Sequence, residues 1–349
     1  MATDRPASAE VVHFITHVRP QHVVKKVGGR KSWLYSGRLG SREVFVKVEV
    51  QDESRQSEID IMQKLLDDNV PHTARMLHGF RLDSHNGFRT EAMILEHHGQ
   101  PLCKFFSYLD SRRRLNQDTV SAVVRQIITA LFGAYRARIL HRDVSIGNIV
   151  ARLRGCEVEA TLIDWGYARL ESASHHPNSN PNNDATVGTM AFRSLRVVNG
   201  CLGRTIIDDI ESVFYVVCYG LVYVYAKGCL GNDFWDMSRK DPAGYRAMTL
   251  DKFPRLVDKL FGDSSCPVDS GTLKVLEDLH EVLFRQVDVD DVFRSKDRDP
   301  REELFPTMMA AICSKFGLDS AVLDLGSSTL EGPNAIRRVS GTPVKQTYQ

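Results

Sequence analysis

The residues best suited to chemistry lie in one short segment, His141-Arg142-Asp143-Val144-Ser145-Ile146-Gly147-Asn148. A carboxylate, Asp143, and an amide, Asn148, stand five residues apart in a segment that the flanking residues predict to be a loop. Transfer of a phosphoryl group needs a carboxylate to orient the attacking hydroxyl, and oxygen ligands that hold Mg²⁺ near the phosphates. Asp143 could supply the carboxylate that orients the hydroxyl, and Asn148 could supply one of the oxygen ligands of Mg²⁺.

A second segment, Leu162-Ile163-Asp164-Trp165-Gly166, supports this interpretation. An apolar strand ends there in an aspartate followed by a flexible glycine, which suits Asp164 as the second metal ligand. Each pattern alone is common, because charged loops and aspartates at strand ends occur in many proteins. Together and in this order they favour a phosphotransferase site.

Lys47 lies in a valine-rich segment, Glu43 to Val50, whose alternation predicts a β-strand. The valines share one face of this strand, and Phe45 and Lys47 share the other. An unpaired ammonium among apolar residues would be costly, so Lys47 needs a charged partner or ligand. The next segment predicts a helix whose inward stripe carries Glu58.

The elements that would position these residues divide the chain into a β-rich half followed by an α-rich half. Asp118 is expected to cap the clearest helix, which continues to Tyr135. Further expected elements are strands at Trp33–Arg38 and Met93–Leu95, a hairpin of 148–152 with 159–163, and an apolar helix through Val213–Ala226.

With these motifs in place, the sequence resembles the eukaryotic protein-kinase superfamily. The catalytic segment is most similar to the fungal-type protein kinases, with casein-kinase-one-like features further on. The resemblance implies an α+β, two-lobed fold with a β-rich N-lobe and a mainly α-helical C-lobe. It divides the chain into an N-terminal segment of uncertain order (1–22), an N-lobe (23–98), a C-lobe (99–318) and a tail expected to be disordered (319–349).

The resemblance also assigns roles by position. Lys47 matches the lysine that holds the α- and β-phosphates of ATP, and Glu58 matches its glutamate partner. Asp143 matches the catalytic base, and Asn148 and Asp164 match the Mg²⁺ ligands.

Weaker assignments concern the rest of the nucleotide site. Gly28 and Gly29 fall where the family has its glycine-rich phosphate loop, although the pattern is not G-x-G-x-x-G. Glu96 to Gly99 match the linker whose backbone holds adenine, so Glu96 and His98 are expected to bind it.

Two residues, Arg142 and Asp209, are expected to organise the catalytic loop. In the family, the arginine at Arg142 often binds a phosphate on the activation segment, and an aspartate at Asp209 hydrogen-bonds the loop backbone. The polar stretch 171–186 offers candidate phosphate acceptors at Ser172, Ser174, Ser179 and Thr186.

The sequence departs from the family at several positions. Ser145 stands where serine/threonine kinases usually have a lysine that reaches the γ-phosphate. Trp165 replaces a phenylalanine. Arg196 replaces the glutamate that closes the activation segment, so the ion pair that locks this segment is expected to be lost.

Three functions follow from these motifs. The first is an active protein kinase acting on Ser or Thr, because Lys47, Glu58, Asp143, Asn148 and Asp164 are all present. The second is a small-molecule kinase of the aminoglycoside or choline type, which shares the H-x-D-x-x-x-x-N loop and often has Ile-Asp-Trp. The third is a pseudokinase scaffold, favoured by the altered glycine loop and by Arg196.

Composition narrows the setting of the protein. The net charge of +1 gives no global field toward nucleic acid or an anionic membrane. Seven scattered cysteines without a C-x-x-C pair favour a reducing compartment, and the polar N-terminus lacks the blocks of a signal peptide. We expect a cytoplasmic or nuclear protein that binds ATP, Mg²⁺ and an unidentified protein substrate, but no nucleic acid or membrane; the oligomeric state is not predicted.

Overall fold

The computed structural model describes residues 15–25, 31–170, 187–201, 203–227, 234–238, 240–262, 268–295 and 298–318. The expectations for Gly28 and Gly29, for the polar stretch 171–186 and for the tail 319–349 therefore lie outside the described residues.

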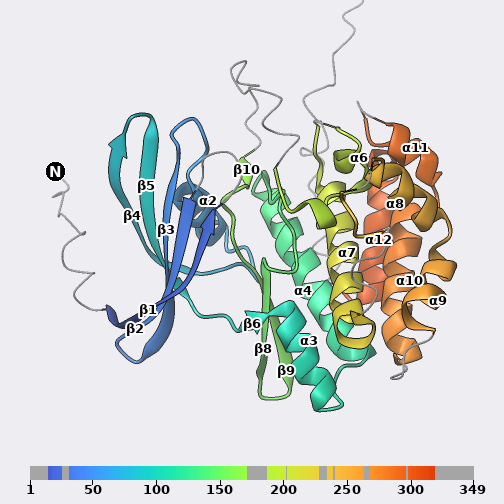
Figure 1. Ribbon diagram of the computed structural model, residues 1–349, viewed down its shortest axis with the longest axis horizontal. Coiled ribbons are helices and arrows are strands. Elements are labelled where there is room, and N and C mark those ends of the chain that lie inside the picture. The colour runs from blue at the N-terminus through green and yellow to red at the C-terminus, as the bar shows by residue number, and fades with distance from the viewer. Residues whose placement is uncertain are drawn as a thin grey trace, which may run out of the picture.

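Within the described residues, the first half of the chain forms a five-stranded antiparallel sheet with helix α2 (Glu58–Asp67) against it (Figure 1). The strand order is β1-β2-β3-β5-β4. The strands are β1 (Ile15–Lys25), β2 (Lys31–Leu39), β3 (Arg42–Asp52), β4 (Met76–His85) and β5 (Phe88–Glu96). The sheet thus begins at Ile15, earlier than Val23, where the sequence pattern placed its start.

The face of β3 that carries Lys47 is buried, and it is partly polar. Glu49 and Gln51 on this face are fully buried, as is Glu91 on the neighbouring strand β5. Glu91 accepts hydrogen bonds from Ser57 (2.5 Å) and from Gln51 (3.2 Å). Because Ser57 is also the N-cap of α2, Glu91 fixes where that helix begins.

The second half of the chain is mainly helical and lies to the right of the sheet in Figure 1. Its helices are α3 (Leu102–Ser111), α4 (Gln117–Arg136), α6 (Leu195–Val198), α7 (Ile206–Tyr225), α8 (Pro242–Asp251), α9 (Phe253–Phe261), α10 (Ser270–Phe284), α11 (Val289–Arg294) and α12 (Phe305–Phe316). Five short strands accompany them: β6 (Gln100–Pro101), β7 (Ile139–Leu140), β8 (Ile149–Arg154), β9 (Glu157–Leu162) and β10 (Arg169–Leu170). This arrangement confirms the expected two-lobed α+β fold.

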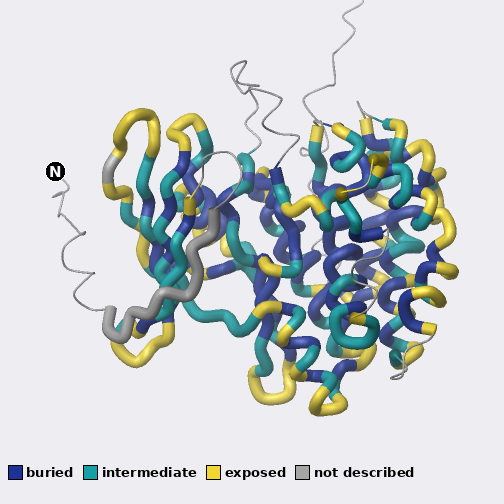
Figure 2. Tube along the Cα trace, in the orientation of Figure 1, coloured by how far each residue is buried: buried dark blue, intermediate teal, exposed yellow. Residues whose placement is uncertain are grey.

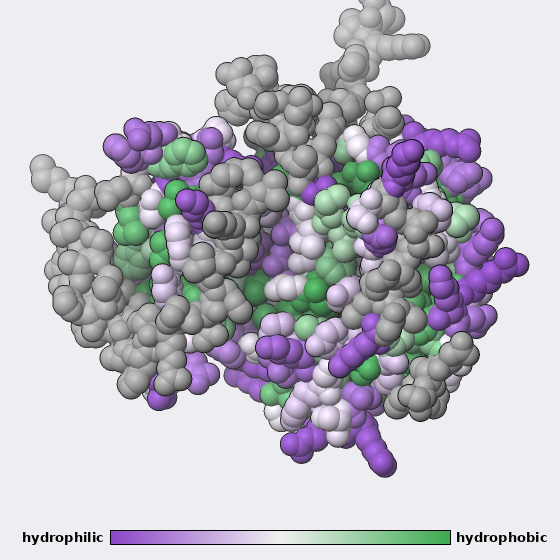
Figure 3. Space-filling model, in the orientation of Figure 1, coloured by the Kyte–Doolittle hydropathy of each residue, from purple (hydrophilic) through white to green (hydrophobic). Residues whose placement is uncertain are grey.

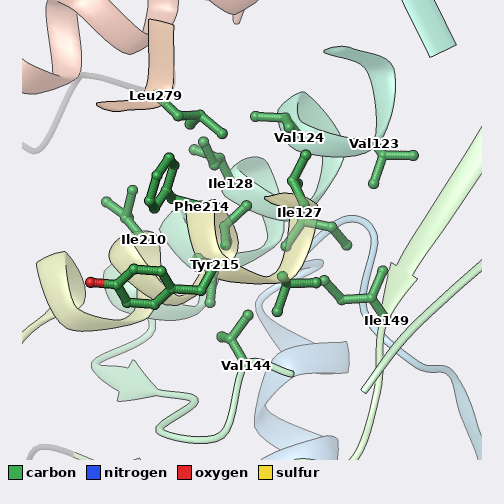
Figure 4. Packing of buried hydrophobic residues seen from close by; sticks show 14 of the residues in the cluster. Val123, Val124, Ile127, Ile128, Val144, Ile149, Ile210, Phe214, Tyr215 and Leu279 are labelled. Carbon is green, nitrogen blue, oxygen red and sulfur yellow. The ribbon is translucent and has the colours of Figure 1, made fainter. Parts of the chain in front are cut away.

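Helices α4 and α7 form the centre of the larger half, and α7 is buried along most of its length (Figure 2). Figure 4 shows Ile127 and Ile128 of α4 close to Ile210 and Phe214 of α7. Hydrophilic side chains cover much of the outer rim of this half (Figure 3). No helix within the described ranges is long and apolar enough to cross a membrane.

The N-cap of α4 differs from the sequence prediction. Asn116, and not Asp118, caps the helix: its side chain accepts from the backbone N–H of Thr119, and the Thr119 hydroxyl accepts from Asn116 in return. Asp118 lies in the first turn, where a negative charge favours the helix dipole. An acidic and an amide side chain two residues apart suit an N-cap equally well, so the sequence pattern did not separate them.

The linker between the two halves, residues 97–99, is held against strand β8. Gly99 has a φ of +124°, and a Cβ at this position would lie 2.3 Å from the carbonyl oxygen of Ala151. The guanidinium of Arg152 donates to the carbonyl oxygen of His97 (2.9 Å). Only glycine permits this approach, so the linker has a fixed position on the larger half.

Candidate active site

The candidate catalytic loop, residues 141–148, is organised around the buried side chain of His141. Its Nδ1 accepts from the backbone N–H of Asp143 (3.2 Å), and its Nε2 lies 3.2 Å from the carbonyl oxygen of Ile163. A neutral imidazole protonated on Nε2 satisfies both contacts. The ring also packs edge-on against Trp165 at 4.5 Å. His141 therefore connects the loop that carries Asp143 to the strand that leads into Asp164.

Asp209 in the first turn of α7 holds the backbone of the same loop. Its two carboxylate oxygens accept from the backbone N–H groups of His141 and Arg142, each at 2.9 Å. The expected contact is thereby confirmed. Arg142 has a φ of +68°, a conformation that few residues with a side chain adopt. These bonds, with that from Arg204 to the Arg142 carbonyl oxygen (2.6 Å), hold this strained peptide in place.

Replacing Asp209 should therefore weaken the protein without touching the reacting atoms. In Asp209→Ala, two buried backbone N–H groups lose their acceptor, which should lower the free energy of unfolding by about 1–3 kcal/mol. Urea denaturation gives the measurement. Exposed Asp118→Ala is the matched control, and an equal loss in both variants would contradict the assigned role of Asp209.

The Asp143 carboxylate is fixed from two sides. Its Oδ1 accepts from the backbone N–H (2.7 Å) and the hydroxyl (2.8 Å) of Thr189, and its Oδ2 accepts from Nδ2 of Asn148 (3.0 Å). Val144, the next residue, points into the core (Figure 4). Each carboxylate oxygen can accept two hydrogen bonds, so Oδ2 keeps capacity for one more donor.

Asn148 is oriented by the same contacts. Nδ2 donates both to Oδ2 of Asp143 and to its carbonyl oxygen (2.8 Å), which uses both amide hydrogens. The amide oxygen makes no hydrogen bond to any described residue, so it can still accept a ligand. Oxygen ligands of this kind suit Mg²⁺.

Lys47 joins the two halves of the molecule. Its ammonium donates to Glu58 (2.5 Å) on α2 and to Asp164 (2.8 Å) after β9, and the residue is only 6% exposed. The ion pair between Lys47 and Glu58 is thus present as expected. Asp164 adopts a left-handed backbone with φ +61°, which aspartate tolerates better than most residues.

Thr189 reaches Asp143 because Gly188 lies directly against the catalytic loop. Gly188 has a φ of +92°, and a Cβ there would lie 2.6 Å from the carbonyl oxygen of Arg142. Arg204 donates to both chain segments, at Arg142 and at Val187. Burial, together with the charge of Arg142, lowers the pKa of Arg204 to about 10, so its guanidinium stays protonated at neutral pH.

The expected loss of an ion pair at Arg196 is wrong. Arg196 is fully buried and pairs with Asp299 (3.1 Å). Asp299 also binds Arg301 (2.9 Å), which in turn pairs with Glu211 (2.7 Å) on α7. The segment that ends at Arg196 is therefore still held by an ion pair, in which the segment carries the arginine and Asp299 supplies the acid. The sequence alone did not reveal this because Asp299 lies 103 residues further on.

Glu96 at the end of β5 and His98 in the linker hold the sheet in register with the segment before β4. The backbone N–H of Glu96 donates to the carbonyl oxygen of Arg75 (3.0 Å), and Nε2 of His98 accepts from the backbone N–H of Arg75 (3.1 Å). Burial lowers the pKa of His98, which favours the neutral ring that this contact needs. The binding of adenine by Glu96 and His98 stays a prediction.

The structure thus gathers the predicted residues into two linked clusters. Lys47, Glu58 and Asp164 form one, and Asp143 and Asn148 form the other; the backbone bond from Ile163 to Asn148 (2.9 Å) connects them. Sequence reasoning did not foresee that Thr189 binds Asp143. It also missed the bond from Ser57 to Glu91, because a serine before a helix signals a cap and nothing more.

Comparison with known proteins agrees with this geometry. The family described as "Fungal protein kinase" matches residues 93–221, a range that begins in β5 and ends in α7. It therefore includes the linker, the catalytic loop, Asp164 and Asp209.

Curated relatives are also kinases. Serine/threonine-protein kinase 36 of Mus musculus is 28% identical over 165 residues, 44% of this chain and 11% of that protein. Serine/threonine-protein kinase TIO of Arabidopsis thaliana is 28% identical over 169 residues, 45% of this chain and 12% of that protein. Calcium-dependent protein kinase 4 of Plasmodium falciparum (isolate 3D7) is 24% identical over 160 residues, 45% of this chain and 28% of that protein.

The matched region spans about a tenth of the length of the first two of these relatives. What they share with this chain is a segment of 160 to 169 residues and not the whole protein. The two-lobed fold, the paired clusters and these matches support membership of the protein-kinase superfamily, within which the chain resembles the fungal protein kinases.

Proposed function

We propose that this chain is an ATP-dependent serine/threonine protein kinase. The observation that carries the proposal is the position of Lys47, whose ammonium lies between Glu58 and Asp164 and joins the two halves at one point. A buried cation held by two carboxylates from different elements suits the binding of a polyphosphate accompanied by a divalent metal.

The side chains present fit Mg²⁺. Asn148 turns its amide oxygen away from Asp143, and Asp164 contributes a carboxylate at the end of the neighbouring strand. Mg²⁺ is commonly held by one or two protein oxygens together with substrate phosphates. When bound, the metal would neutralise charge on the phosphates.

The chain's own residues account for the remaining chemistry. Lys47 would hold the phosphates, and Oδ2 of Asp143 would accept a hydrogen bond from the substrate hydroxyl. The hydroxyl oxygen attacks the γ-phosphorus, the bond from that phosphorus to the β,γ-bridging oxygen breaks, and ADP leaves. The hydroxyl proton passes to Asp143, which Thr189 and Asn148 keep oriented.

A protein substrate is favoured by the segment that follows Gly188. Arg246 of α8 donates to the carbonyl oxygens of Ala191 (3.0 Å) and Arg193 (2.6 Å). This anchors residues 188–196 beside Asp143 as a platform along which a peptide could lie. A small-molecule kinase needs no such platform. Incubation with labelled ATP, Mg²⁺ and either protein or small hydroxyl and amino acceptors separates the two functions.

Nucleotide binding provides a direct test of the metal assignment. Mg-ATP should raise the melting temperature, because a ligand that binds only the native state stabilises it by RT ln(1 + [L]/Kd). Asp164→Ala should remove the part of this shift that depends on Mg²⁺. The measurement is a thermal scan with ATP in the presence of Mg²⁺ or of a chelator. An unchanged magnesium response in Asp164→Ala would falsify the assignment of Asp164.

A further inference from the structure

An aromatic pair lies where the sheet meets the linker. The ring of Phe45 on β3 stacks on the ring of His97, with centroids 5.0 Å apart and planes 25° from parallel. His97 belongs to the linker that Arg152 and Gly99 hold against β8. One ring thus comes from the sheet and the other from the fixed connection between the halves.

The register of β3 relates this pair to Lys47. Phe45 precedes Lys47 by two residues, so both side chains leave the same face of the strand, with Cα atoms about 7 Å apart. The neighbouring Val44 is opposite Glu96, the last residue of β5. The end of β3 that carries Phe45 therefore lies next to the linker.

If a nucleoside triphosphate binds with its phosphates at Lys47, its base can extend along this face of β3 in only one direction. On the far side of Lys47, Glu49 and Gln51 are fully buried, and Gln51 is bonded to Glu91. On the near side, Phe45 is half-buried. With the phosphates on Lys47 and Asp164, the base must extend toward Phe45 and the linker.

We propose that the contact between Phe45 and His97 is a gate on the base-binding end of the nucleotide site. The two rings fill the space that the base would enter, so binding of ATP requires them to separate. This inference rests on the proposed function, because it takes Lys47 as the phosphate-binding group. It goes further in assigning Phe45 and His97 a role in setting nucleotide affinity.

Removing either ring should then strengthen the binding of ATP. An aromatic pair of this kind contributes enough to change Kd by about twofold to tenfold, so Phe45→Ala and His97→Ala should each lower the Kd for Mg-ATP by that factor. Mg-tripolyphosphate has no base, and its Kd should stay the same in both variants. Isothermal titration calorimetry measures both ligands.

A second stacked pair in the sheet supplies a matched control. His78 and Phe80 on β4 stack with centroids 6.3 Å apart and planes 25° from parallel, away from Lys47. Phe80→Ala should alter neither Kd. This control separates opening of the site from a general loosening of the sheet.

The outcomes distinguish the gate from the proposed function. Weaker binding of ATP by Phe45→Ala would show that the ring supports the base, and unchanged binding would show that it has no part; either result overturns the gate alone if tripolyphosphate still binds. If neither ligand binds to any variant, the phosphate site itself is wrong, and both proposals fall.

Discussion

Asp143→Asn should transfer phosphate about 10²- to 10⁴-fold more slowly than the wild-type protein, which is the usual contribution of a positioned general base. The substitution keeps the size of the side chain, and the amide oxygen can still accept from Thr189. The amide nitrogen would face Nδ2 of Asn148, so one hydrogen bond is lost, at a cost of about 0.5–1.5 kcal/mol. The fold and the binding of Mg-ATP should therefore survive.

Transfer from labelled ATP to a protein acceptor measures the rate, and the Mg-ATP shift in melting temperature measures binding. Asp118→Asn, an exposed aspartate in the first turn of α4, is the matched exchange of a carboxylate for an amide, and it should change neither. Full transfer by Asp143→Asn would rule out Asp143 as the base. Loss of ATP binding in this variant would instead mean that the residue acts on the nucleotide.

Arg196→Ala should cause the largest loss of stability, about 3–5 kcal/mol, because it removes one partner from a buried cluster of charges. Asp208, Asp299 and Glu211 surround Arg196 and Arg301, and all five are buried. Without Arg196, three carboxylates share one guanidinium.

Urea denaturation of Arg196→Ala and Arg196→Lys gives the measurement. The lysine keeps the charge but cannot reproduce the separate contacts that Arg196 makes with Asp299, the Ser295 carbonyl oxygen and Cys201. Arg196→Lys should therefore lower the free energy of unfolding, but by less than Arg196→Ala does. Lys64→Ala, which breaks an exposed pair with Asp68, should shift the midpoint little. Equal effects of the buried and the exposed substitution would mean that the buried cluster does not stabilise the fold.

Acid gives an independent readout of the same cluster. Burial alone would raise the pKa of Asp299, but Arg301 and Arg196 outweigh it and hold that pKa below its usual value. A carboxyl whose folded pKa is depressed contributes stability above its unfolded pKa of about 3.9 and loses it as the pH falls through the folded value. In Arg196→Ala this acid loss should be smaller, because the folded pKa lies closer to the unfolded one.

The positions of the residues that we propose to be catalytic were predictable because their signals are local. His141 to Asn148 and Leu162 to Gly166 each place a required group at a fixed spacing in a loop or at a strand end. Alternation likewise placed Lys47 on the face of its strand opposite the valines, although it did not show that this face is the buried one. Such patterns depend on the backbone geometry of a few consecutive residues, which the sequence states directly.

Contacts between distant segments were harder to foresee. Arg196 was read as the loss of an acid, although Asp299 supplies an acid from the opposite side, 103 residues away. The stack of Phe45 on His97 depends on how the linker returns past the sheet, which the alternation of β3 does not specify. In both cases the missing information was which segments meet in space.

The polar inner face of β3 bears on the order in which the molecule opens. Glu49, Gln51 and Glu91 occupy positions that apolar side chains could have filled, whereas α4 and α7 meet through aliphatic and aromatic residues. Hydrophobic contact is non-directional, but the polar contacts of the sheet require exact partners and lose their strength once water enters. We expect amide hydrogens of the sheet to exchange with solvent by local opening well before those of α7, which should exchange only on global unfolding.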